Sequence, residues 1–287
     1  MNSSVFSSMH THTIFCDGRD DVETMCRAAY EKNLYAIGFS AHAPLEKTAG
    51  IKTFWNLPEE KKDEYIEAVL AAKKRWQGKL EVLLGFEVDY IKGRRSALDE
   101  DITSCNPDYI IGAVHFIVPP NGTEPFTIDG SLEELVTGVN NGFGGDMNAL
   151  IHAYYDASLE MIKLGGFDIL AHPDIIKKNY RNEKPWDTKA EAARQKEVSI
   201  AAAKAGITVE VNTGGINRGK IDEVYPSLSF LRMLRENNVP VIITADAHRA
   251  EHINGNYDIA VQTLKQAGCT EHGITLPSLP RSGCKIL

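Results

Sequence analysis

The sequence predicts an α/β barrel whose strands are all parallel. Short apolar runs rich in β-branched residues recur along the 287-residue chain, and longer segments with helical spacing separate most of them. Barrels of this kind are commonly built as one domain at this length. We therefore expect a single domain over residues 1–287, with an apolar core large enough to need no disulfide or second domain.

Seven short apolar segments are predicted to be the strands. The first lies just before a run of polar residues near the N-terminus, and each later one is dominated by Val, Ile, Leu and Phe and is too short for a typical helix. In chain order the segments are residues 5–14, 35–40, 80–88, 109–114, 167–171, 207–212 and 239–245.

Amphipathic segments between these runs predict the helices. The first helix begins near Asp20 and Asp21, because Asp caps helix N-termini, and its apolar side chains from Val22 to Ala29 recur on one face. The later helices are predicted over residues 58–76, 146–164, 188–205, 227–237 and 256–267. Residues 116–130 are rich in Pro and Gly and predict a long loop, which either covers a binding site or is ordinary surface.

Charge and composition disfavour several classes of protein. Lys and Arg number 31 against 39 Asp and Glu, which gives a net charge of -8, and no basic block is present for binding nucleic acid. No apolar run has the roughly 18 to 20 residues of a membrane span, and the N-terminus lacks the pattern of a secretory signal. The five cysteines include no CxxC pair, so we expect a reducing, cytoplasmic location.

A potential metal ligand or polar anchor stands at the end of each predicted strand. Because the C-terminal ends of parallel strands meet at one end of a barrel, these side chains are expected to converge although they span most of the chain. In chain order they are His10 and His12, His42, Glu87, His115, His172, Asn212, and Asp246 with His248.

Their spacing suits a site for several cations. The His-Thr-His sequence at 10–12 places two imidazoles two residues apart, and the Asp-Ala-His sequence at 246–248 does the same with a carboxylate and an imidazole. Side chains at this spacing lie on one side of an extended chain. Imidazole and carboxylate together suit Zn, Mn or Fe. A single histidine is more often structural than a metal ligand, but six of the nine histidines follow predicted strands. For the other three, His152, His252 and His272, the structural interpretation is favoured. Cys16 is expected to be a small buried side chain.

Motifs along nearly the whole chain resemble the PHP (polymerase and histidinol phosphatase) family, and within it the monofunctional histidinol-phosphate phosphatases. In order they are HTHTIFCDG at 10–18, SAHAP at 40–44, GFEVDY at 85–90, GAVHF at 112–116, FDILAHPDIIKK at 167–178, EVNTGG at 210–215 and TADAH at 244–248. Pro173 stands where a Leu-like residue is more usual in the family, a difference that leaves every proposed ligand in place.

The resemblance implies a distorted (β/α)7 barrel with a trinuclear metal centre at the C-terminal ends of its strands, loaded with Zn, Mn or Fe. His10, His12, Glu87 and Asp246 would hold the first ion, and Glu87, His115 and His172 the second. Asp17, His42 and His248 would hold the third, although an Asp before Gly18 is otherwise a routine turn residue.

Basic residues after the later strands are candidates for phosphate binding. Arg218 is the strongest, because its guanidinium fork matches phosphate oxygens, and the alternative is a solvated loop arginine. Lys177, Lys178 and Arg181 could add positive charge near the phosphate, and the alternative for each is a solvated side chain. Asn212 is expected to orient a metal ligand, to bind substrate or to cap its loop.

The expected reaction is hydrolysis of L-histidinol phosphate, a step of histidine biosynthesis, by in-line attack of a metal-bound hydroxide on phosphorus. Asp246, Glu87, His248 and Arg218 are the expected catalytic residues. Two alternatives remain: a phosphoesterase of the same fold with a nucleotide, oligonucleotide or other small ester as substrate, and a metal-binding regulatory protein without turnover. The expected partner is a small phosphate ester, with neither nucleic acid nor membrane, and a homo-oligomer is left open.

Overall fold

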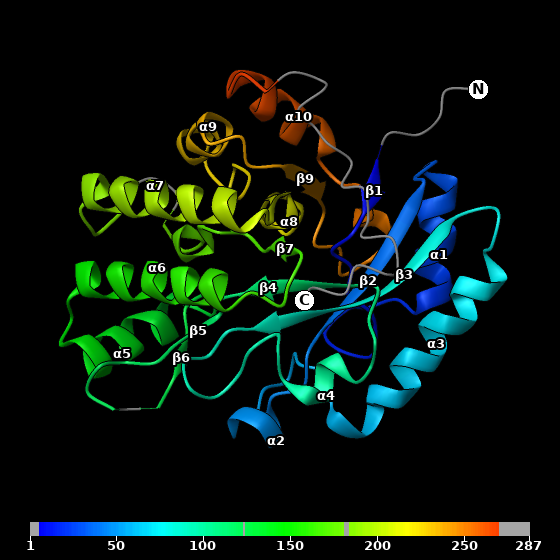
Figure 1. Cartoon of the computed structure of the whole chain (residues 1–287), viewed down its shortest axis with the longest axis horizontal. Coiled ribbons are helices and arrows are strands. Elements are labelled where there is room, and N and C mark those ends of the chain that lie inside the picture. The colour runs from blue at the N-terminus through cyan, green and yellow to red at the C-terminus, as the bar shows by residue number, and fades with distance from the viewer. Residues whose placement is uncertain (1–5, 123, 181–183, 270–287) are drawn as a thin grey trace.

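Seven parallel strands form the centre of the protein in a computed structural model that describes residues 6–122, 124–180 and 184–269 (Figure 1). Every strand of this sheet pairs with its neighbour in parallel, as the sequence predicts. In the order of the sheet the strands are β1 (Ser7–Ser8), β2 (Ala36–His42), β3 (Glu81–Asp89), β4 (Tyr109–Ala113), β7 (Ile169–Leu170), β8 (Thr208–Asn212) and β9 (Val241–Thr244).

The two edges of this sheet come together, which makes it a nearly closed barrel. Beyond β1 and β9, Thr11 and Ala247 form a parallel bridge. The backbone N–H of His12 donates to the Ala247 carbonyl at 2.9 Å, and the N–H of Ala247 donates to the His10 carbonyl at 3.0 Å. The predicted (β/α)7 barrel is therefore confirmed, and its closing seam lies between the segments that carry the first and last candidate ligands.

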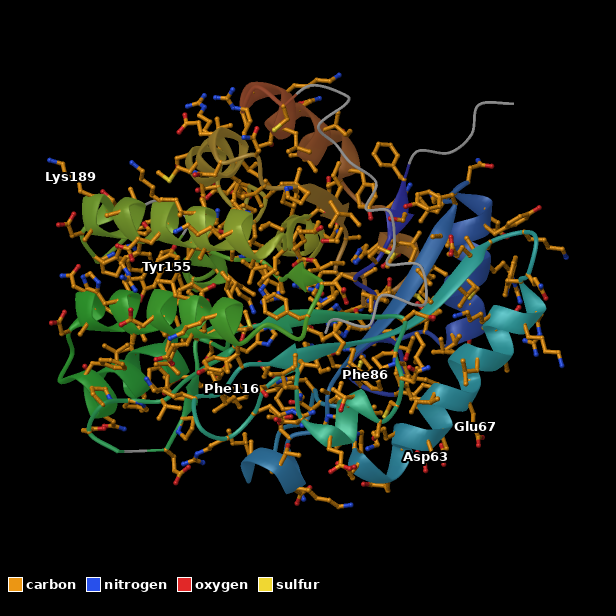
Figure 2. The ribbon with its side chains drawn as sticks, in the orientation of Figure 1. Asp63, Glu67, Phe86, Phe116, Tyr155 and Lys189 are labelled. Carbon is orange, nitrogen blue, oxygen red and sulfur yellow. The ribbon has the colours of Figure 1, made fainter. Side chains whose placement is uncertain are left out.

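Helices surround the barrel, with α1 and α3 along one side and α6 and α7 along another (Figure 1). Figure 2 shows Tyr155 of α6 between these last two helices, where its hydroxyl accepts from Gln195 of α7 at 3.1 Å. The helices are α1 (Val22–Glu31), α2 (Glu46–Ala49), α3 (Lys62–Arg75), α4 (Glu100–Thr103), α5 (Leu132–Phe143), α6 (Met147–Leu164), α7 (Thr188–Ala205), α8 (Gly214–Asn217), α9 (Leu228–Glu236) and α10 (Tyr257–Gln266), with 3-10 turns at Glu59–Lys61, Ile175–Lys177 and Ala250–His252.

Alternation along the strands divides the core into two layers. On β3, Leu83 packs inside the barrel, while Leu84 faces the surrounding helices. Ile111 and Ile110 of β4 alternate in the same way. Because successive side chains of a strand point to opposite faces, Glu87, four residues after Leu83, also points into the barrel, above its apolar filling.

Residues 116–143 differ most from the sequence prediction. The expected loop contains a hairpin, in which β5 (Phe116–Ile117) pairs antiparallel with β6 (Phe126–Thr127). Helix α5 follows it and begins in a capping box, where Ser131 and Glu134 accept each other's backbone N–H. The sequence gives no clear signal for this hairpin, because each of its strands is only two residues long and depends on tertiary contacts.

The remaining boundaries agree with the prediction to within a few residues, except at two short strands. β1 covers only Ser7–Ser8 within the predicted 5–14, and β7 covers Ile169–Leu170 within the predicted 167–171. After β1 the chain leaves the regular ladder, and its polar residues turn toward the barrel mouth. Among the described helices, none combines the length and the apolar character needed to cross a membrane.

Candidate metal centre

Glu87 lies at the middle of a group of buried imidazoles at the C-terminal mouth of the barrel. Its Oε2 atom is 2.9 Å from Nδ1 of His42, 3.1 Å from Nε2 of His10 and 3.6 Å from Nε2 of His12. Its Oε1 atom is 3.1 Å from Nε2 of His172 and 3.5 Å from Nε2 of His115. One carboxylate therefore faces imidazoles that come from four different strand ends.

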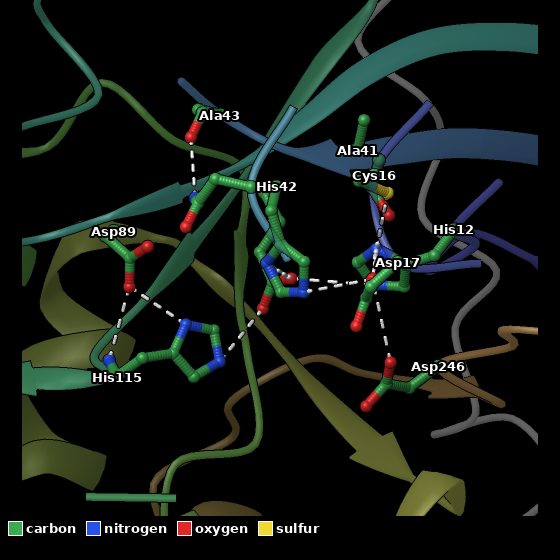
Figure 3. Close-up of polar contacts among 12 residues, drawn as sticks. His12, Cys16, Asp17, Ala41, His42, Ala43, Asp89, His115 and Asp246 are labelled. Atoms are coloured by element: carbon green, nitrogen blue, oxygen red, sulfur yellow. Dashed lines mark hydrogen bonds and ion pairs between the residues drawn. The ribbon is translucent and has the colours of Figure 1, made fainter. Parts of the chain in front are cut away.

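The His-Thr-His segment after β1 points both imidazoles to the same side, as its spacing predicts. The rings of His10 and His12 have their centroids 5.1 Å apart. His12 lies between two further imidazoles, and its ring centroid is 4.3 Å from those of both His42 and His248. Figure 3 shows His12 close to Asp17, with His42 between this pair and His115.

Asp17 and His248 form the more open side of the group. Nε2 of His248 is 3.0 Å from Oδ2 of Asp17, and Nε2 of His42 is 3.8 Å from Oδ1 of Asp17. The tight turn at 16–18 brings Asp17 here, and a Cβ atom on Gly18 would lie 2.5 Å from the backbone of His12. Only glycine fits this close approach, which gives the CDG sequence a structural reason.

Asp246 reaches the centre from an unusual backbone conformation. Its φ angle is +47°, a left-handed value that is uncommon outside glycine and is often found at functional sites. Its Oδ1 atom is 3.4 Å from Nε2 of His12. Arg218 donates from Nη2 to the other carboxylate oxygen at 2.9 Å and from Nη1 to the Asp246 carbonyl at 3.1 Å, which fixes the side chain in this position.

Several ligand atoms in this group are buried and lack hydrogen-bond partners among the described residues. They are Nε2 of His10 and His12, Nδ1 of His42, Oδ1 of Asp17 and Oε2 of Glu87. Some of these atoms lie close to one another without forming a hydrogen bond. Nδ1 of His42 and Oε2 of Glu87, for example, are 2.9 Å apart, but their geometry is not that of a hydrogen bond. Uncompensated burial of this kind is costly, and divalent cations would satisfy these atoms. The donor set thus fits metal ions.

All nine predicted ligands belong to groups of three or four whose ligand atoms lie within 4.8 Å of one another. The groups are His12, Asp17, His42 and His248; His10, His172 and Asp246; His10, His12 and Glu87; and His42, Glu87 and His115. Because the groups share members, the assignment of each side chain to a particular ion stays a prediction.

The electrostatics of the centre differ from one imidazole to another. Burial, together with the nearby His248 and His42, lowers the pKa of His12 to about 3. Burial also opposes protonation of His115, but the carboxylates of Asp89 and Glu87 outweigh it and raise its pKa to about 10. A cation ligated by His115 would therefore take the place of a proton.

A cavity of about 620 Å³ opens over this centre. Its wall includes His42, Glu87, His115, His172, Asp246 and His248 from the centre, together with Arg218, Lys220, Lys178, Asp129, Glu134, Phe54 and Trp55. Thr127, Asp129 and Gly130 of the segment predicted to be a loop border this space. The N–H of the neighbouring Ile128 donates to the His115 carbonyl at 2.9 Å and ties the segment to the centre. Both anionic and cationic side chains line the cavity, and its volume is large enough for a small phosphate ester.

The model of the PHP domain family matches residues 8–214, a stretch that carries seven of the nine predicted ligands. The chain belongs to the PHP family. The predicted family is thereby confirmed.

Relatives with similar sequences or folds carry related names. A protein of Deinococcus radiodurans named "Probable histidinol-phosphatase" is 25% identical over 260 residues, which are 90% of this chain and 92% of that protein. A Listeria monocytogenes structure named as a candidate histidinol phosphatase superposes with a TM-score of 0.76 at 23% identity, over 88% of this chain and 98% of that one. The structure of a Lactococcus lactis histidinol phosphate phosphatase, solved with zinc, L-histidinol and phosphate, superposes with a TM-score of 0.64 at 18% identity. The match covers 92% of this chain and 94% of that one.

Among the predicted phosphate contacts of this PHP chain, the structure places two on the cavity wall. Arg218 lines the cavity while it holds Asp246. Lys178 also lines it, but its ammonium group is paired with the carboxylate and carbonyl of Asp129. Asn212 is buried. Its Oδ1 atom accepts from the N–H of Gly214 at 2.7 Å, as a loop cap would, and its Nδ2 atom donates to Oδ2 of Asp246 at 3.4 Å. Arg181 lies outside the described residues.

Lys177 is a correction to the sequence analysis, because it is fully buried and is neither solvated nor on the cavity wall. Its ammonium group is 3.0 Å from the Asp174 carboxylate and 2.9 Å from the Glu223 carboxylate, so it holds loops of the PHP barrel together. Cys16 contacts the centre without joining the candidate ligand groups: its Sγ atom is 3.5 Å from Nδ1 of His12. His152 lies on α6 outside the cavity wall.

Two carboxylates beside the PHP centre were missed in the sequence. Asp89 accepts from Nδ1 of His115 at 2.8 Å, as Figure 3 shows, and Glu210 accepts from Nδ1 of His10 at 2.8 Å. Each lies two residues from an inward-facing polar side chain, Asp89 after Glu87 and Glu210 before Asn212. Strand alternation was the available signal, since it places both inside the barrel.

Proposed function

We propose that this PHP protein is a metal-dependent phosphomonoesterase that hydrolyses L-histidinol phosphate to L-histidinol and phosphate. The observation that carries the proposal is the cluster of unpaired, buried imidazole and carboxylate atoms around Glu87, beneath a cavity that Arg218 lines. The relatives support the choice of ester, because one with the same fold was solved with zinc, L-histidinol and phosphate.

Three divalent ions, of Zn, Mn or Fe, are proposed for the centre. His10, His12, Glu87 and Asp246 would hold one, Glu87, His115 and His172 another, and Asp17, His42 and His248 the third. Bound ions of this kind neutralise phosphoryl oxygens and make a water molecule acidic enough to act as the nucleophile at neutral pH. Imidazole nitrogen and carboxylate oxygen suit these metals better than calcium or magnesium.

The side chains of the cavity position the ester and handle the proton. In this proposal Arg218 binds phosphoryl oxygens with N–H groups of the guanidinium that also holds Asp246. Burial would raise the pKa of Asp246, but Arg218 and His10 outweigh it and hold the pKa well below its usual range. Asp246 is therefore ionised at neutral pH. In this proposal its carboxylate accepts the proton lost by the attacking water and passes it to the leaving alkoxide oxygen, without a phosphoenzyme.

Phosphate release tests this function directly. With zinc or manganese present, purified protein is expected to hydrolyse L-histidinol phosphate with a kcat/KM at least about tenfold above that for a nucleoside monophosphate or 4-nitrophenyl phosphate. A higher kcat/KM for the nucleotide would identify a PHP phosphoesterase of another specificity. Metal binding without phosphate release from any ester would favour the non-catalytic alternative.

A further inference from the structure

Glu210 is a fully buried carboxylate on β8 whose two oxygens are shared among four polar groups. Oε2 lies 2.8 Å from Nδ1 of His10 and accepts from the Thr244 hydroxyl at 2.8 Å. Oε1 accepts from the backbone N–H of His172 at 2.7 Å and from Nδ2 of Asn212 at 2.8 Å. These partners come from four different segments around the barrel, and Glu210 does not line the cavity.

An ionised carboxylate only accepts hydrogen bonds, so the His10 nitrogen that faces Glu210 must carry the proton. In the neutral imidazole this leaves the lone pair on Nε2, the atom 3.1 Å from Glu87 and 3.8 Å from Asp246. Resting on the metal-dependent function above, we propose that Glu210 is a positioning residue: it fixes the tautomer of His10 that can ligate a cation and joins it to the His172 backbone.

The substitution Glu210→Gln tests the tautomer because the new amide must turn its NH2 group to one side. On the Oε1 side both neighbours are donors. The backbone N–H of His172 cannot accept a hydrogen bond, and Asn212 faces residue 210 with its NH2 group, because its Oδ1 atom is held by the N–H of Gly214 at 2.7 Å. On the Oε2 side, the Thr244 hydroxyl can rotate to accept. The NH2 group therefore faces His10, whose Nδ1 becomes the acceptor, and the proton moves to Nε2, the nitrogen that would bind metal.

Asp89 provides the contrasting case beside His115. One oxygen, Oδ1, faces Nδ1 of His115 at 2.8 Å and its backbone N–H at 3.3 Å, whereas Oδ2 is buried without a hydrogen-bond partner among the described residues. In Asp89→Asn the amide can keep its oxygen toward His115 and place NH2 where Oδ2 was. This variant loses the same charge as Glu210→Gln but keeps the tautomer of the adjacent ligand.

The experiment measures zinc affinity and zinc content per chain in the full-length protein, by competition with a chelator and by elemental analysis. Glu210→Gln is expected to weaken one zinc site by about 10- to 100-fold, the effect typical of outer partners of metal ligands. Asp89→Asn is expected to weaken binding by less than about threefold, well below that range. Glu191→Gln is the matched control, since Glu191 is also buried and hydrogen-bonded, to Trp186 and Lys184, but is remote from the ligand groups.

Nitrogen NMR of ¹⁵N-histidine-labelled wild-type protein gives a second readout that needs no variant. Nδ1 of His10 is expected to be the protonated nitrogen in wild type. An unprotonated Nδ1 would overturn the proposal, as would unchanged zinc affinity in Glu210→Gln or equal losses in Glu210→Gln and Asp89→Asn. Neither readout depends on turnover, so failure to hydrolyse L-histidinol phosphate would refute the proposed function and leave this result to be judged separately.

Discussion

Glu87→Gln is expected to lower kcat/KM for L-histidinol phosphate by about 10³-fold or more, because several kcal/mol of transition-state stabilisation depend on the ions that Glu87 holds. Its two oxygens face five imidazoles, at 2.9 to 3.6 Å. A glutamine would turn an NH2 group toward imidazole nitrogens that need to face cations, and it would remove the charge at the middle of the site. Zinc content per chain is expected to fall together with activity.

Glu81→Gln is the matched control for this variant. Glu81 begins the same strand as Glu87 but is exposed at the opposite end of β3, so its substitution is expected to change kcat/KM less than about twofold. Steady-state phosphate release and elemental analysis on the same preparations check both variants. Retention of wild-type zinc and turnover in Glu87→Gln would contradict a centre built around this carboxylate.

Arg218→Ala is expected to reduce kcat/KM by about 10- to 150-fold, which corresponds to losing roughly 1.5–3 kcal/mol of hydrogen bonding to a charged group. The loss is expected mainly in KM, because Arg218 lines the cavity and is proposed to bind phosphoryl oxygens. A smaller loss in kcat is expected as well, since its guanidinium also holds the Asp246 carboxylate at 2.9 Å.

Arg232→Ala separates this effect from a general loss of positive charge. Arg232 is exposed on α9 and does not line the cavity, so its variant is expected to match wild type. Arg218→Lys is expected to recover only part of the loss, because an ammonium group cannot reproduce the two-pronged contact of a guanidinium. Unchanged steady-state constants in Arg218→Ala would refute the assignment of this residue.

The sequence was sufficient to predict the barrel and the convergence of the candidate ligands, and the reason is geometric. Parallel strands bring their C-terminal ends to one mouth, so polar residues that follow strands meet even when they are as distant as His10 and His248. The seven predicted strands all occur in the sheet, and the helices from α6 to α10 that were expected lie within a residue of their predicted limits.

What the sequence could not supply depends on contacts between distant segments. Lys177 has the sequence character of a solvated lysine, yet two carboxylates surround it in the fold. The pairing of Lys178 with Asp129 depends on where the hairpin segment crosses the mouth. Glu210 lies inside a strand, where only alternation indicates its direction, and none of its four partners except Asn212 is near it in sequence.

Removing and restoring metal is the most direct test of the central claim that these scattered side chains meet around shared cations. Protein stripped by a strong chelator and verified to be metal-free is expected to release no phosphate from L-histidinol phosphate above the uncatalysed rate. Turnover is then expected to return in proportion to the zinc or manganese bound per chain. Full activity in verified metal-free protein would contradict the account.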